Sequence, residues 1–71
     1  HMPVTNEYVV SGMHCAHCVS SVTEEVSAVS GVTDVKVDLD SGQLIVTSDT
    51  DIPFESIETA VDEAGYSVAT A

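Results

Sequence analysis

The feature that most constrains the fold of this chain is a change in the spacing of its apolar residues. Valines placed three, four and three positions apart form the stripe of an amphipathic helix, and they are Val19, Val22, Val26 and Val29. Over residues 32–39 the spacing becomes two, and one face carries Val35, Val37 and Leu39. Strict alternation of this kind predicts a half-buried strand. The chain therefore has to pack helix and strand against a common apolar core.

Weaker signals predict the remaining elements. Residues 7–10 indicate a first strand, since Tyr8, Val9 and Val10 are aromatic or β-branched, and residues 40–47 supply a turn followed by a partner strand. A second helical stripe is formed by Phe54, Ile57, Val61 and Ala64. Gly31 and Gly65 are expected to end the two helices, and residues 66–69 fit a last strand.

The resulting order is strand–helix–strand–strand–helix–strand, which is two strand–helix–strand halves. Its compact solution is an α+β fold, the ferredoxin-like βαββαβ sandwich, with a four-stranded antiparallel sheet and both helices on one face. The 71 residues make a single domain, 1–71. Residues 1–3 are expected to be disordered, and His1-Met2 has the form of an expression scar.

Charge narrows the classes of function. The chain has 12 Asp and Glu residues against one basic residue, Lys36, and its formal net charge is -11. Nucleic acids and anionic membrane surfaces both attract Lys and Arg, so neither is an expected ligand. No apolar run is long enough to cross a membrane and no signal peptide is recognisable, so membrane insertion is not expected and a cytoplasmic location is the default. A protein partner is expected to present a basic or neutral face.

The only two cysteines, Cys15 and Cys18, lie two residues apart where the first strand gives way to the first helix. Thiolates are soft ligands that favour Cu(I), and a linear two-sulfur geometry suits that ion, whereas structural Zn(II) usually takes four ligands. Cys18 is expected in the first helical turn, where the helix dipole favours its thiolate, and Cys15 in the loop before it. One anchored and one mobile sulfur suit exchange of an ion more than its storage.

Other chemistries of a cysteine pair can be weighed. Zinc would need further ligands, for which only His14 and His17 are at hand, and c-type haem attachment would need His where Val19 stands. A thiol–disulfide oxidoreductase remains an alternative, as does a pair of inert buried thiols. Either histidine could serve as a third metal ligand, and both could instead be solvent-facing residues that tune thiol acidity.

Two residues expected near the cysteine pair each allow two interpretations of their role. Met13 could offer its thioether to a metal, or it could plug the core at the junction of strand and loop. Tyr66 follows the helix-ending Gly65, and the expected topology brings it to the same end of the sheet as Cys15. Its ring could shield a bound metal or simply pack.

The run Gly12-Met13-His14-Cys15-Ala16-His17-Cys18 resembles the Gly-Met-x-Cys-x-x-Cys signature of the heavy-metal-associated domain family, and the likeness extends from Glu7 to Ala69. The resemblance implies that Cys15 and Cys18 are the two Cu(I) ligands and that Met13 is a buried support. His17 and Tyr66 are similar to residues that bacterial copper chaperones carry near the metal. Members that handle zinc, cadmium or lead tend to have Asp in place of His14.

The resemblance therefore implies a cytosolic Cu(I) chaperone, not an enzyme, that takes part in copper homeostasis. Its cargo would pass by thiolate ligand exchange to the metal-binding domain of a copper-transporting P-type ATPase. Zn(II) and Hg(II) rank below Cu(I) as cargo, and a copper-dependent homodimer is a second arrangement. The alternatives are an N-terminal metal-binding domain of such an ATPase and, from another class, a small thiol–disulfide oxidoreductase.

Overall fold

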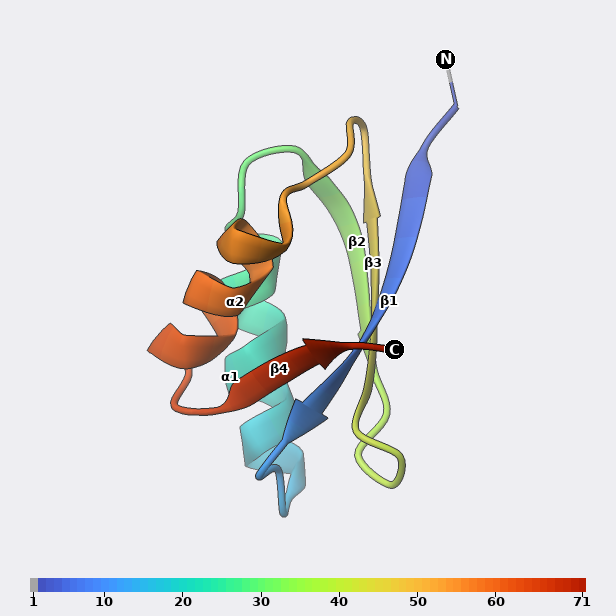
Figure 1. Ribbon diagram of the computed structural model, residues 1–71. Coiled ribbons are helices and arrows are strands. Elements are labelled where there is room, and N and C mark those ends of the chain that lie inside the picture. The colour runs from blue at the N-terminus through green and yellow to red at the C-terminus, as the bar shows by residue number, and fades with distance from the viewer. Residues whose placement is uncertain (1) are drawn as a thin grey trace.

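A computed structural model describes residues 2–71, and it has the element order that the sequence predicts (Figure 1). The strands and helices are β1 (Val4–Ser11), α1 (Ala16–Ser27), β2 (Val32–Val37), β3 (Gln43–Ser48), α2 (Phe54–Glu63) and β4 (Ser67–Thr70). The strands form one sheet in the order β2-β3-β1-β4, and all three pairings are antiparallel. Both helices lie on one face of the sheet (Figure 1). The predicted ferredoxin-like fold is confirmed.

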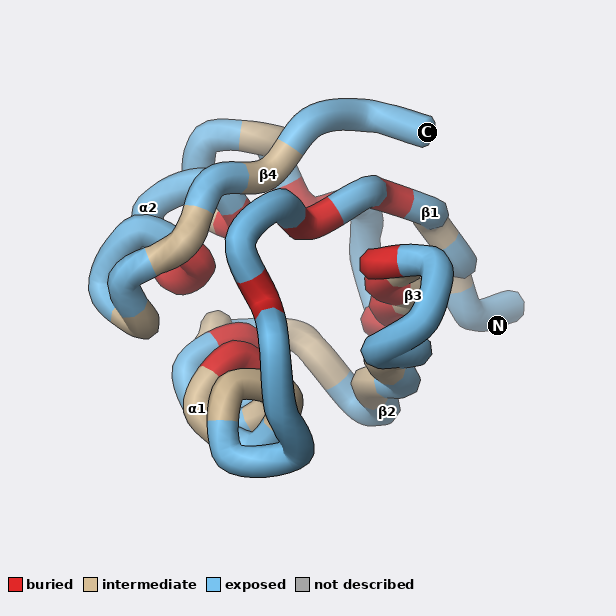
Figure 2. The backbone as a smooth tube through the Cα atoms, turned by 90° about the horizontal axis from the view of Figure 1, so that it is seen from below, coloured by how far each residue is buried: buried red, intermediate tan, exposed pale blue. Residues whose placement is uncertain are grey.

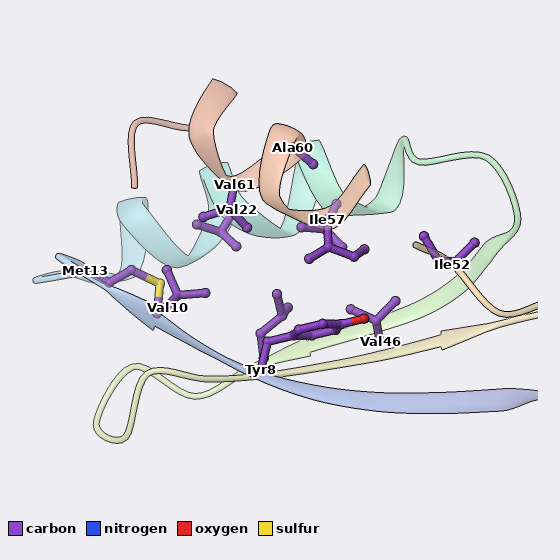
Figure 3. Packing of buried hydrophobic residues seen from close by; sticks show 11 residues of the cluster. Tyr8, Val10, Met13, Val22, Val46, Ile52, Ile57, Ala60 and Val61 are labelled. Carbon is purple, nitrogen blue, oxygen red and sulfur yellow. The ribbon is translucent and has the colours of Figure 1, made fainter. Parts of the chain in front are cut away.

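The core lies between the sheet and the two helices, as the periodicities predict. Alternate strand residues point inward, and the helices contribute residues from both predicted stripes (Figure 3). The residues of this core are Tyr8, Val10, Met13, Val22, Val26, Leu44, Val46, Ile52, Ile57, Ala60 and Val61. Val19, Val29, Phe54 and Ala64, which close the two stripes, are partly buried and pack against this core. Because α1 ends at Ser27 with Ala28 as its C-cap, Val29 and Gly31 lie beyond the helix, and the prediction that Gly31 ends it is wrong. Burial of these apolar side chains is what stabilises the fold.

Leu39 was expected on the inner face of the second strand, and this prediction is wrong. The strand β2 ends at Val37, and Leu39 is 36% exposed. The turn begins at Asp38, because the N–H of Gly42 donates to the Asp38 carbonyl at 2.8 Å and the Asp38 carboxylate accepts from the hydroxyl of Ser41 at 2.9 Å. Local hydrogen bonding by Asp therefore overrides the alternating pattern.

Strand ends also differ by a few residues from the sequence pattern. The first strand begins at Val4 rather than Glu7, because residues 4–9 pair with β3 along its full length. The last strand spans Ser67–Thr70, one residue later than predicted. The prediction of disorder at residues 1–3 concerns in part His1, which lies outside the described residues. That residues 1–71 form a single domain stays a prediction.

The end of the molecule at which β1 leads into α1 carries both cysteines. Figure 2 looks at this end and shows a loop of exposed backbone interrupted by one buried position, which is Met13. The turn between α2 and β4 lies at the same end of the molecule, so Tyr66 comes close to this loop (Figure 1). No helix in the described range is long and apolar enough to cross a membrane.

Candidate metal centre

Cys15 stands at the N-cap of α1, with an extended backbone at φ -157° and ψ 168°. Its carbonyl accepts the N–H of Cys18 at 3.0 Å and that of Val19 at 3.3 Å, which closes the first turn. An N-cap side chain usually accepts a hydrogen bond from the first turn, and Ser, Thr, Asp and Asn are preferred for that reason. The Cys15 side chain makes no such bond. Its sulfur is exposed and free for other chemistry.

Cys18 lies in the first turn of α1, three residues beyond the N-cap, as predicted. Its side chain is partly buried and packs against the core, whereas that of Cys15 is exposed. The two Sγ atoms are 3.4 Å apart and both thiols are free. The helix therefore fixes one sulfur and the loop presents the other beside it.

Hydrogen bonds make the Cys18 thiol acidic. The largest effect comes from the backbone of His14, followed by the Tyr66 hydroxyl and the Cys15 side chain, and together they lower the pKa of Cys18 from 9.0 to about 6. Donors of this kind stabilise the thiolate relative to the thiol. Since the thiolate is the form that binds metals, Cys18 is ready to act as a ligand at neutral pH.

The end of α2 explains how Tyr66 reaches Cys18. The N–H of Gly65 donates to the Asp62 carbonyl at 2.9 Å and that of Tyr66 to the Val61 carbonyl at 3.1 Å, the two bonds of a Schellman motif. Gly65 has φ +94°, a left-handed conformation that this motif requires and that Gly adopts without strain. The motif turns the chain sharply, and Tyr66 donates its hydroxyl hydrogen to Cys18.

The Tyr66 ring also covers the start of the cysteine loop. A Cβ atom built on Gly12 would lie 3.4 Å from the Cδ1 atom of Tyr66, so the ring packs on bare backbone. Gly12 has φ +97°, which again favours glycine. The hydrogen bond to Cys18, with burial and the nearby cysteine charges, raises the pKa of Tyr66. Tyr66 therefore contacts both ends of the loop that carries the sulfurs.

Met13 and the two histidines occupy different environments. Met13 is only 9% exposed, and Figure 3 shows its side chain directed inward at the Val10 end of the core. His14 and His17 are exposed. Within residues 2–71, no three or more His, Cys, Asp or Glu side chains are gathered as a metal would need. The arrangement itself offers a pair of sulfurs, with the histidines beside it.

A pair of free, adjacent thiols with one acidic member can bind a soft ion or form a disulfide. Comparison with known proteins separates these chemistries. The sequence model of the heavy-metal-associated domain matches residues 7–67. The chain belongs to this family.

Relatives within the heavy-metal-associated domain family carry copper in their names. The copper chaperone CopZ of Bacillus subtilis (strain 168) is 39% identical over 61 residues, which are 84% of this chain and 88% of that relative. The solved CopZ metallochaperone is 31% identical with a TM-score of 0.86, over 93% of this chain and 100% of that one. A copper-binding domain from HMA7, a P-type ATPase, is 28% identical with a TM-score of 0.88, over 99% and 95% of the two chains.

The family assignment from the sequence is thereby confirmed, and the chain is a copper-chaperone-like protein with a cysteine pair. Chaperones of this family carry an ion rather than transform a substrate, which supports the prediction that the chain is not an enzyme. Sequence reasoning placed Tyr66 near the site but missed its hydrogen bond to Cys18 and its packing on Gly12. The Gly65-Tyr66 pair after a helical stripe was the available signal, because it predicts the turn that aims the ring.

Proposed function

We propose that this protein is a cytosolic Cu(I) chaperone in which Cys15 and Cys18 hold the ion. The observation that carries the proposal is the 3.4 Å separation of two free sulfurs at an exposed end of the fold. Metal–sulfur bonds are about 2.3 Å long, so an ion in line between two sulfurs separates them by about 4.6 Å. The exposed Cys15, which no capping bond restrains, can supply this movement while the helix holds Cys18. A cytosolic environment keeps such thiols reduced.

Transfer would follow from ligand exchange. A thiolate of the partner attacks the bound Cu(I) from the exposed Cys15 side, a three-sulfur intermediate forms, and one of the original sulfurs leaves as a thiolate. The backbone of His14 and the hydroxyl of Tyr66 stabilise the free Cys18 thiolate. These donors lower the free energy of the empty protein and so favour release of the ion. Copper keeps its oxidation state throughout, and each bond broken is replaced by an equivalent one.

The neighbours of the sulfurs have supporting parts in this proposal. Met13 supports the loop from inside the core, and Tyr66 stands as a hydrogen-bond donor and cover beside Cys18. His14 and His17 are exposed auxiliary positions that could complete the coordination of Zn(II), which with Hg(II) ranks below Cu(I) as cargo. Softness of the two sulfurs is the reason for ranking Zn(II) below Cu(I), and similarity to copper chaperones is the reason for ranking Hg(II) below it.

The partner that we propose is the metal-binding domain of a copper-transporting P-type ATPase. Its support is the similarity to a copper-binding domain of one such ATPase and to CopZ chaperones. The same similarity supports the alternative that this chain is itself a domain of an ATPase. The complete coding sequence distinguishes the two, because an ATPase would continue into membrane spans.

A copper-bridged homodimer is the other proposed assembly. Its dependence on salt concentration distinguishes it from a complex with an ATPase domain. Two copies with a formal charge of -11 each repel one another, so salt should strengthen the homodimer by screening that repulsion. A complex with a basic partner should weaken with salt. Sedimentation of the copper-loaded protein at low and high NaCl shows whether added salt strengthens or weakens the association.

The ligand assignment is tested by competition for Cu(I) against a strong chelator. Mutation of a residue that hydrogen bonds to a metal ligand typically lowers metal affinity by about 10–100-fold, and loss of a ligand itself should cost more. We therefore expect Cys15→Ser and Cys18→Ser each to weaken binding by more than about 100-fold. Ser20→Ala, an exposed change two residues beyond Cys18 on the same helix, is the matched control and should leave affinity unchanged. X-ray absorption of the loaded protein should show a sulfur shell. An unchanged affinity in either Ser variant, or a shell of nitrogen and oxygen, would refute the two-sulfur site.

A thiol–disulfide oxidoreductase is the second candidate, and the pKa of Cys18 beside the Cys15 thiol is the observation that favours it. Family membership and the copper chaperone relatives weigh against it. Reduction of insulin disulfides by the metal-free protein tests this directly. We expect no turnover above the rate of the free dithiol reagent, and efficient turnover would favour the oxidoreductase.

A further inference from the structure

A groove lies between α2 and β4, next to the cysteine pair but separate from it. It has a volume of about 300 Å³. Its lining consists of Glu58, Thr59, Asp62, Tyr66, Ser67 and Val68. Tyr66 belongs to both places, since it is one of the residues that line this α2–β4 groove and its hydroxyl donates to Cys18. Anything bound in the groove therefore lies one aromatic side chain away from the sulfurs.

The groove is acidic, and the chain offers little to neutralise it. Glu58 and Asp62 are one helical turn apart on the exposed side of α2, where like charges repel. The only Lys or Arg in the sequence is Lys36, on β2. The strand order β2-β3-β1-β4 puts β2 and β4 at opposite edges of the sheet, so Lys36 is remote from the groove. A cation from another molecule would relieve the repulsion.

The other residues that line the groove indicate which kind of cation fits it. An aromatic ring and an aliphatic side chain, from Tyr66 and Val68, can pack a hydrocarbon stem and a flat charged group. The hydroxyls of Thr59 and Ser67 add acceptors beside the two carboxylates. A guanidinium group is planar, stacks on aromatic faces and donates five hydrogen bonds in fixed directions, which an ammonium does not.

We propose that the α2–β4 groove receives an arginine side chain of the protein that accepts Cu(I), an inference that rests on the proposed function. The docked arginine holds the acceptor beside Tyr66 and so keeps its thiolate close to Cys15 and Cys18. Holding two reactants together in this way raises their effective concentration and replaces a bimolecular encounter by a local step.

The occupant is a different protein and not a second copy of this chain. The sequence contains no arginine, and a second copy could offer only Lys36. Each copy also has a formal charge of -11, which opposes approach of one acidic groove to another copy. An acceptor with an exposed arginine close to its own cysteines meets both requirements.

The test follows backbone amide signals of the reduced, copper-free protein by NMR during titration with N-acetyl-arginine amide. N-acetyl-citrulline amide, which has nearly the same shape without the charge, is the matched probe. We expect saturable shifts centred on residues 58–68 with the arginine probe and none with the citrulline probe. Equal shifts with both probes, shifts spread over the whole acidic surface, or no saturable shift would each overturn the proposal.

Two double variants distinguish binding of arginine in the groove from attraction by the overall negative charge of the protein. Glu58→Gln with Asp62→Asn removes two charges from the groove, and Glu24→Gln with Glu25→Gln removes two from exposed positions on α1. We expect the first pair to weaken arginine binding about tenfold and the second to leave it within about twofold. Equal weakening in both pairs would overturn the proposal.

Copper binding by the same variants keeps this inference distinct from the proposed function. The groove variant should hold Cu(I) as tightly as the unmodified protein in chelator competition, because neither Glu58 nor Asp62 contacts the sulfurs. If the unmodified protein fails to bind Cu(I), the proposed function fails whatever the arginine titration shows. If copper binding is intact and arginine does not bind, the groove proposal alone fails.

Discussion

The loop between β1 and α1 and the loop between β3 and α2 hold equivalent places in the two strand–helix–strand halves (Figure 1). Because β1 and β3 are antiparallel, these two loops lie at opposite ends of the sheet. Each loop buries one apolar side chain just before its helix, Met13 at 9% exposure in the first and Ile52 at 8% in the second. The fold thus uses the same kind of anchor twice.

The two loops differ in what they do with their polar groups. At the start of the second loop, Ser48, the buried last residue of β3, donates its hydroxyl to the Thr50 carbonyl at 2.6 Å, and the Asp49 N–H donates to the Gly31 carbonyl at 2.9 Å. In the first loop the side chains at the helix start are two sulfurs that contact each other, and that of Cys18 also accepts a hydrogen bond from Tyr66. The first loop is thus held by the buried Met13 and by Tyr66, without a side-chain cap at Cys15, and its two sulfurs stay free for ligands.

The largest effect is expected from removing the two anchors. Met13→Ala and Ile52→Ala should each lower the free energy of unfolding by about 2 kcal/mol or more, since both delete buried side chains at the margin of the core. Urea denaturation of the metal-free variants measures this. Only Met13→Ala should also weaken Cu(I) binding, because only that loop holds the sulfurs. Equal copper affinities in the two variants would mean that the Met13 anchor does not organise the site.

The next effect is the pH dependence of copper binding at the first loop. With a pKa of about 6, Cys18 is a thiolate above that pH and takes up a proton below it, so a proton competes with Cu(I) only on the acid side. From pH 7 to pH 5 this protonation alone should weaken binding about tenfold. Chelator competition at both pH values measures the ratio. An affinity that is the same at both would contradict an acidic Cys18.

A smaller effect is expected when Tyr66 loses its hydroxyl. Tyr66→Phe keeps the ring on Gly12 but removes a donor from Cys18, so the pKa of Cys18 should rise above about 6. Thiolate absorbance of the metal-free protein, titrated over pH, gives the midpoint. Tyr8→Phe, on β1 and in the core, is the control and should leave that midpoint in place. A midpoint that Tyr66→Phe also leaves in place would show that the hydroxyl does not act on the sulfur.

The smallest effect is expected on the melting temperature, and it depends on acidic side chains that are distributed unequally between the helices. α2 carries four acidic residues and α1 two. Screening one like-charged pair a turn apart recovers about 0.2–0.5 kcal/mol, and for a domain of this size 0.5 kcal/mol raises the melting temperature by about 2–4 °C. We therefore expect a rise of a few degrees between 0.02 and 0.5 M NaCl. Neutralising Glu58 and Asp62 should reduce this rise more than neutralising Glu24 and Glu25, which are adjacent and do not face each other.

Local patterns in the sequence were enough to predict the element order and the place of the cysteines. The valine stripe of α1, the stripe of α2 and the alternation in β2 each depend on neighbours within a few residues, and the structure has all three. The same locality explains the error at Leu39, where the side-chain hydrogen bonds of Asp38 ended the strand early. Short polar residues compete with strand pairing in a way that apolar periodicity does not record.

The order of residues along the chain was sufficient to predict two helices on a four-stranded sheet and two soft sulfurs where a strand meets a helix. The surroundings of those sulfurs, in contrast, depend on how the elements pack in three dimensions. The hydrogen bond from Tyr66 to Cys18 joins residues 48 positions apart, and the α2–β4 groove exists because α2 and β4 pack side by side. Contacts of this range depend on the packing of whole elements against one core, which no local pattern of residues encodes.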